Sequence, residues 1–131
     1  MRKFKFSKLV RDKIVKRIIS DGNKPNWREL TEGEYIQELK NKILEESLEI
    51  PKSKNNDDLI KELADIQEII DNLLEVLKIS KPKFKQIQDK KNEKAGSFKK
   101  RLYIEDVETK KEKTEWVKYY LSNPDKYPEI K

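Results

Sequence analysis

The chain has 131 residues, of which 34% are hydrophobic and 43% charged, and a net charge of +6; this length fits one small domain. With no cysteine and no histidine, the chain has no disulfide, no thiolate zinc site, and no imidazole base or metal ligand. Any catalysis must therefore depend on carboxylates, lysines, hydroxyls and a bound cation.

The first predicted elements are a short strand and a helix. Residues 1–6 alternate apolar and basic side chains, a pattern typical of a strand. Residues 8–20 carry apolar side chains at helical spacing, and Asp21 and Gly22 follow where that spacing ends. A helix over 8–20 is therefore expected.

A second helix is predicted from Thr31 to about Ile50. Glu34 stands three residues after Thr31, which is the spacing of a capping box. Pro51 then ends the helix, because a residue before proline disfavours the helical conformation.

Two further helices are predicted after a polar loop. The longest spans about 58–78, capped by Asn56 or Asp57, and contains most of the chain's regularly spaced leucines and isoleucines. A fourth helix spans about 82–95, with proline in its first turn and Gly96 at its end.

The C-terminal part is predicted to contain a strand, a charged connection and a short helix. Residues 98–104 could pair with residues 1–6 in a small two-stranded sheet, residues 105–115 form the charged connection, and Thr114 caps the short helix. The predicted fold class is all-α, an antiparallel bundle of four main helices. The domain is expected to cover 1–104, followed by the charged connection, short helix and tail in 105–131.

The charge is segregated along the chain. Residues 1–31 hold 10 basic and 3 acidic side chains, residues 32–75 hold 5 and 13, and residues 76–131 hold 16 and 9. Only 5 of the 31 basic residues are arginine, the side chain best suited to base and phosphate recognition. An acidic middle between basic flanks favours a cation site with anion-binding groups around it, and no nucleic-acid partner is expected.

The prediction of a functional site is based on two groups of carboxylates. The second helix contains Glu45, Glu46 and Glu49, and the third contains Glu62 and Asp65. Residues three apart share a helix face, and two helices joined by a short loop pack antiparallel. The two groups should therefore meet at the loop end of the hairpin.

These acids continue the apolar faces of their helices. Glu62 falls in the stripe formed by Ile66, Ile69 and Leu73, and Glu46 continues the corresponding stripe of its own helix. Two carboxylates about 4 Å apart repel by about 4 kcal/mol at an effective dielectric near 20, so a cation is expected between them. All-oxygen ligands favour Mg²⁺, with Mn²⁺ as the alternative.

Three segments together resemble the MazG-like and phosphoribosyl-ATP pyrophosphohydrolase-like family of all-α nucleotide pyrophosphohydrolases. They are the KLVRDKI opening at 8–14, the EExxE and ExxD pair at 45–65, and the lysine-rich stretch at 91–98. Ala95 and Ser97 depart from the Arg and second Gly usual in the third segment. The resemblance implies a dimeric or tetrameric helical bundle that converts a nucleoside triphosphate and water to a monophosphate and pyrophosphate, often acting on non-canonical nucleotides.

The resemblance also implies residue roles. The metal ligands would be Glu46, Glu49, Glu62 and Asp65, and Glu45 would position the attacking water. Glu45, Glu46 and Glu49 are thus the catalytic candidates, since without histidine a carboxylate must accept the water proton. The candidate contacts to the triphosphate are Lys8, Arg11, Lys13, Lys91 and Lys94.

Three alternatives remain open. A true phosphoribosyl-ATP pyrophosphohydrolase would prefer that substrate, although the KLVRDKI opening argues against it. A non-catalytic nucleic-acid binder would show salt-dependent affinity, and a silent interaction module would show no thermal stabilisation by divalent cations.

The second predicted helix is apolar on two sides. Leu44 and Leu48 lie opposite Glu46, and a lone small bundle buries both faces poorly. A homodimer or homotetramer is therefore expected. No apolar run reaches the roughly 20 residues of a membrane span and the N-terminus lacks the apolar region of a secretory signal, so a cytoplasmic protein without a membrane partner is expected.

Overall fold

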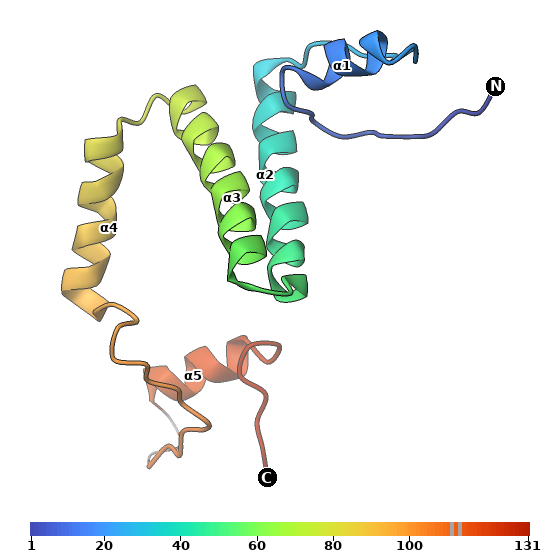
Figure 1. Ribbon diagram of the computed structural model, residues 1–131. Coiled ribbons are helices and arrows are strands. Elements are labelled where there is room, and N and C mark those ends of the chain that lie inside the picture. The colour runs from blue at the N-terminus through green and yellow to red at the C-terminus, as the bar shows by residue number, and fades with distance from the viewer. Residues whose placement is uncertain (111, 113) are drawn as a thin grey trace. The chain divides into compact units, whose positions relative to one another are not determined.

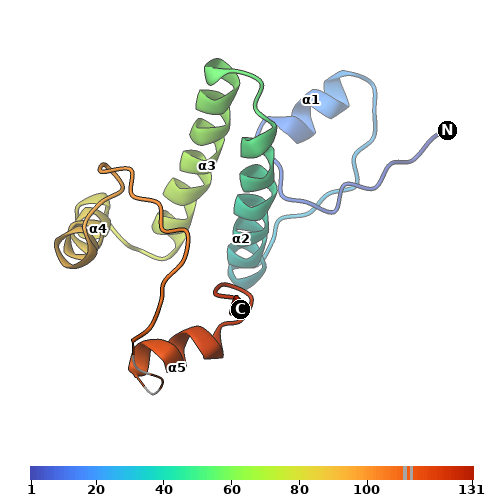
Figure 2. The same ribbon diagram turned by 90° about the horizontal axis from the view of Figure 1, so that it is seen from below.

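A helical hairpin forms the centre of the structure. Helices α2 (Glu32–Glu49) and α3 (Asn56–Val76) lie side by side and antiparallel, joined through the short 3-10 helix η1 (Ile50–Lys52) (Figures 1 and 2). The computed structural model describes residues 1–110, 112 and 114–131.

Three more α-helices complete the secondary structure. They are α1 (Ile14–Ser20), α4 (Lys81–Ala95) and α5 (Glu115–Ser122). The described residues contain five α-helices and no strand, which confirms the all-α class. The chain divides into two compact units, Met1–Glu93 and Lys94–Lys131; the predicted domain division after residue 104 stays a prediction.

The caps explain where the hairpin helices begin. The Thr31 side chain accepts a hydrogen bond from the Glu34 amide at 3.3 Å, and the Glu34 carboxylate accepts one from the Thr31 amide at 3.1 Å, so the predicted capping box is confirmed. The predicted cap of α3 is wrong by one or two residues. Asn55 caps this helix by accepting from the Asp58 amide at 2.9 Å, and the first turn then carries two aspartates, Asp57 and Asp58, which suit the helix dipole.

Helix α1 begins six residues later than predicted. Residues 8–13 do not form helix, and the first backbone hydrogen bond of this region runs from the Ile14 amide to the Arg11 carbonyl. The side chains of Lys8 and Arg11 instead reach carboxylates of the hairpin. The predicted helix over 8–13 is therefore wrong, and these residues form an irregular segment whose side chains contact the hairpin.

The predicted pairing between 1–6 and 98–104 is not confirmed. Residues 1–6 are exposed and irregular. In the second segment, a turn closes with the Arg101 amide donating to the Phe98 carbonyl at 3.1 Å, and Arg101 has a φ of 60°. This left-handed residue is incompatible with a continuous strand.

Two predictions for the C-terminal part are confirmed: the end of the fourth helix and the cap of the last helix. Helix α4 ends before Gly96, whose φ of 83° favours glycine. The Thr114 side chain caps α5 by accepting from the Val117 amide at 3.3 Å, as predicted. In the predicted charged connection 105–115, residues 111 and 113 lie outside the described residues.

The core lies between α2 and α3 and is small. Among the described side chains, the buried hydrophobic residues are Leu39, Ile69 and Leu74. Extensive packing between described elements is confined to α2, η1 and α3, so a four-helix antiparallel bundle is not confirmed. Among the described helices, none has a stretch both long and apolar enough to cross a bilayer.

Candidate metal centre

Three carboxylates converge where the hairpin helices face one another. Glu46 lies in the last turn of α2. Glu62 lies in the second turn of α3, and Asp65 lies one turn further along that helix. Each offers an oxygen, and these oxygens lie within 4.8 Å of one another. All three side chains are half-buried. Of the three glutamates predicted to meet Glu62 and Asp65, the cluster contains Glu46 alone.

The cluster leaves one oxygen unsatisfied. The Oε2 atom of Glu62 is buried and has no hydrogen-bond partner among the described residues. A buried acceptor of this kind costs about 1–3 kcal/mol, and more when it is charged. A cation bound among the three carboxylates would supply its missing partner.

The environment of Glu46 disfavours its charge. Burial raises the pKa of Glu46 above its ordinary value, and the adjacent Glu62 carboxyl and the Asp65 charge raise it further, while Lys42 opposes them. Because neighbouring negative charges favour the protonated form, Glu46 in the cation-free cluster retains its proton more strongly than an isolated carboxylate does.

Glu45 lies in different surroundings from its neighbour Glu46. Its two oxygens accept hydrogen bonds from Lys8 Nζ at 3.2 Å and Lys42 Nζ at 3.1 Å. These two bonds, that from Lys42 first, lower the pKa of Glu45. Glu45 is therefore an ionised, lysine-paired residue beside the cluster.

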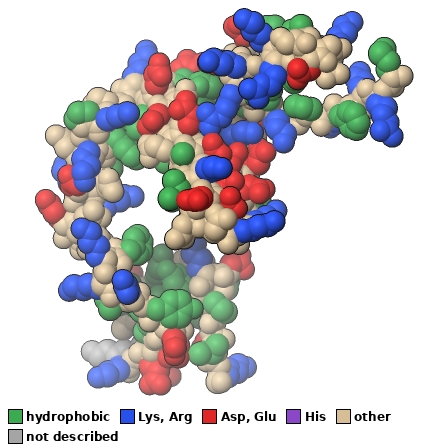
Figure 3. Space-filling view, in the orientation of Figure 1, with side chains coloured by type: hydrophobic (Ala, Val, Ile, Leu, Met, Phe, Trp, Pro, Cys, Tyr) green, Lys and Arg blue, Asp and Glu red, His purple; other side chains and the backbone are tan. Residues whose placement is uncertain are grey.

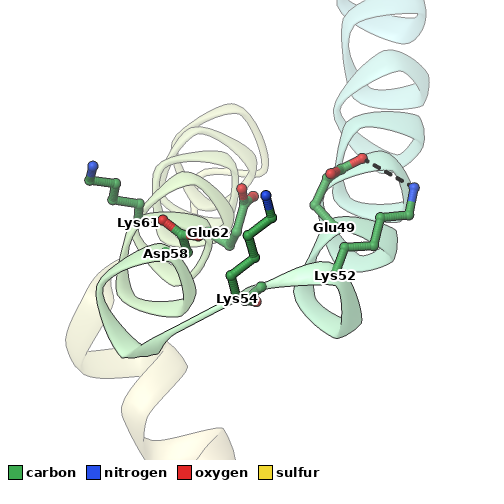
Figure 4. Close-up of a pocket in the computed structure, with 7 residues that line it drawn as sticks. Glu49, Lys52, Lys54, Asp58, Lys61 and Glu62 are labelled. Atoms are coloured by element: carbon green, nitrogen blue, oxygen red, sulfur yellow. Dashed lines mark ion pairs between the residues drawn. The ribbon is translucent and has the colours of Figure 1, made fainter.

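Glu49 does not belong to the three-carboxylate cluster. It is exposed, and its Oε1 lies 3.8 Å from Lys52 Nζ. It does line an open pocket of about 310 Å³ at the loop end of the hairpin, and Glu62 lines the same pocket (Figure 4). The predicted fourth ligand thus stands across a pocket from the cluster.

Several lining residues of this pocket were not identified from the sequence. They come from η1, the following loop and the first turns of α3: Lys52, Ser53, Lys54, Asp58 and Lys61. Figure 4 shows the Lys54 side chain beside Glu62 and Lys52 beside Glu49, whereas Lys61 points away from Glu62. The position of the lining residues between the two acidic motifs is the signal that could have identified them.

The five predicted phosphate-binding residues lie in three different surroundings. Lys8 and Arg11 form ion pairs with Glu45 and Asp65, so they lie at the site but on its carboxylates. Lys13 is exposed at the start of α1. Lys91 and Lys94 are exposed on α4, which does not pack extensively on the hairpin.

The surface reflects this charge distribution. Figure 3 shows acidic side chains gathered over the hairpin, with basic side chains beside them toward α1.

Comparison with known proteins finds no matching family model, curated protein or solved structure. The function proposed below is therefore based on the geometry of this site.

Proposed function

We propose that the chain is a divalent-cation-dependent nucleotide pyrophosphohydrolase of the MazG-like type. The observation that supports this most strongly is the unpartnered Oε2 of Glu62 within a cluster that also contains Glu46 and Asp65. Three carboxylates without a cation are mutually repulsive, so their placement on facing helices favours a functional role over a structural one.

The donor set fits a hard cation. Glu46, Glu62 and Asp65 offer only oxygen, and Mg²⁺ or Mn²⁺ prefers such ligands. Glu49, across the adjoining pocket, would join them in the proposed site. A cation held there supplies charge neutralisation at phosphate oxygens and activation of a bound water.

The chain's own residues would bind and orient the substrate. Lys52, Lys54 and Lys61 line the pocket next to the cluster and would attract the polyphosphate. Water attacks the α-phosphorus, the bond to the bridging oxygen of the β-phosphate breaks, and pyrophosphate leaves. With no histidine in the chain, one of the carboxylates at the site would accept the proton of that water.

Pyrophosphate release tests this proposal. We expect release from one or more nucleoside triphosphates, canonical or modified, that requires Mg²⁺ or Mn²⁺ and falls at least 100-fold in Glu62→Gln, since a general acid–base or ligand defect costs about that much. Glu68→Gln is the matched control, because Glu68 is an exposed glutamate on the same helix outside the cluster.

Equal rates in Glu62→Gln and the wild type would contradict the proposed site. The same screen includes phosphoribosyl-ATP, so that a preference for this substrate would identify the alternative enzyme. Strong, salt-dependent RNA or DNA binding without hydrolysis would favour the nucleic-acid binder instead.

We also propose that a second copy of the chain completes the bundle. Leu44, Leu48 and Ile60 are 62%, 59% and 61% exposed, and their helical positions lie away from Glu46 and Glu62. Two hairpins that bury these side chains against each other would form a four-helix arrangement.

A further inference from the structure

The segment before α1 is attached to the candidate metal centre by two ion pairs. Arg11 Nη2 lies 2.7 Å from Asp65 Oδ1, and Lys8 Nζ lies 3.2 Å from Glu45 Oε1. Asp65 belongs to the three-carboxylate cluster. The guanidinium of Arg11 is therefore the positive charge that contacts the cluster directly in the cation-free structure.

We propose that Arg11 is an exchangeable counter-ion of this centre. It neutralises Asp65 while no divalent cation is bound, yields that carboxylate to the cation, and is then free to bind an anionic group of the cation's partner, such as a phosphate. This inference depends on the proposed function, because it assumes that the cluster binds a cation.

The strengths of the contacts favour exchange. The Arg11 and Asp65 side chains are 62% and 41% exposed, and solvent-exposed ion pairs are weak. A divalent cation at the cluster would attract Asp65 more strongly than a single charge does and would repel the guanidinium. The ion pair should therefore give way when the cation binds.

The geometry leaves Arg11 suitable for a second role. The hydrogen bond to Asp65 uses Nη2 alone among the five guanidinium donors. A planar group with free donors matches the oxygens of a phosphate in a bidentate manner. The Arg11 carbonyl accepts a hydrogen bond from the Ile14 amide at 3.0 Å, and rotation of the exposed Arg11 side chain moves the guanidinium without breaking that bond.

Cation affinity tests the exchange. Titration calorimetry with MnCl₂ would compare the wild type with Arg11→Gln and Arg17→Gln. Arg17 is an exposed arginine on α1 with no ion pair among the described residues, so its variant loses the same charge without losing the contact. We expect Arg11→Gln to bind Mn²⁺ about two- to fivefold more tightly, the range that an exposed ion pair corresponds to, and Arg17→Gln to match the wild type.

A second measurement follows the segment itself. The chain has no cysteine, so a Lys13→Cys variant takes a single spin label beside Arg11. We expect MgCl₂ to increase the mobility of this label, and the same label in Arg11→Gln to be mobile already and unaffected by MgCl₂.

The outcomes separate this inference from the proposed function. If the wild type binds Mn²⁺ but Arg11→Gln binds it equally or more weakly, the exchange is wrong and the metal centre stands. If the wild type binds no divalent cation, the proposed function is wrong and the inference fails with it.

Discussion

At the scale of single residues, Glu46 shows how the candidate site lowers the stability of the fold. Its pKa is raised by burial and by the Glu62 and Asp65 carboxyls, so the native state holds this proton more tightly than the unfolded state does. Stability therefore falls as pH rises through the raised pKa of Glu46. At neutral pH, without a cation, the cluster destabilises the fold.

Glu46→Gln should increase the stability of the fold, because it removes one charge from the cluster. In EDTA at pH 7 we expect the free energy of unfolding to rise by about 1 kcal/mol, the repulsion of two charges about 4 Å apart in a water-like dielectric. At pH 4, below the ordinary glutamate pKa of 4.5, the difference should shrink, because a larger share of Glu46 carries its proton. Urea unfolding followed by circular dichroism at both pH values measures it, with Glu68→Gln as the control. A loss of stability in Glu46→Gln at pH 7 would show that the cluster is not strained.

At the scale of elements, the N-terminus of α2 is held by a small network. Arg28 donates to both Glu34 oxygens at 3.0 and 2.6 Å, while Glu34 and Thr31 complete the capping box. The hydrogen bond from Arg28 and that from the Thr31 amide lower the pKa of Glu34 to about 2. This end of the hairpin is thus fixed by local contacts.

Removing the cap tests that contribution. Thr31→Ala should lower the free energy of unfolding of the hairpin by about 1 kcal/mol, because the side-chain acceptor for the Glu34 amide is lost. Thr31→Ser keeps the acceptor and should be close to the wild type. Equal stability of the alanine and serine variants, measured by urea unfolding, would contradict the role of the cap.

The caps also show what the sequence can predict. The capping box at Thr31, the end of α2 near Pro51 and the cap at Thr114 follow from neighbouring residues, so local patterns identify them. The start of α1 could not be predicted in the same way. Arg11 pairs with Asp65, 54 residues away, and local sequence patterns do not report contacts between residues so far apart in the chain.

The candidate site was also predicted in part. Helical periodicity places Glu46, Glu62 and Asp65 on facing sides of the hairpin, and the structure brings them together. Periodicity does not report how a helix ends, so the position of Glu49 across the pocket, beside Lys52, was not predicted.

At the scale of the whole molecule, the main feature is how little of the chain is buried. The described core comprises Leu39, Ile69 and Leu74, whereas a domain of this length ordinarily buries about two thirds of the surface of its unfolded chain. The hairpin alone leaves large apolar side chains in water, which favours association of two copies.

We therefore expect a dimer in solution. Multi-angle light scattering should give about twice the chain mass of 15.7 kDa. Leu48→Lys should weaken the dimer at least 100-fold, since each buried leucine contributes about 1.5–3 kcal/mol and two are lost. Leu121→Lys is the matched control, because Leu121 is 60% exposed on α5 while Leu48 is 59% exposed on α2. A monomer at every concentration would overturn this expectation.

The short connection through η1 has a consequence for how the protein folds. Glu46 and Asp65 lie 19 residues apart in the sequence, because η1 and a brief loop join their helices directly. Contacts between residues close in sequence form quickly, since little chain entropy is lost when the intervening loop closes. The carboxylate cluster would thus assemble as soon as the two helices meet, while the remaining segments are still unstructured.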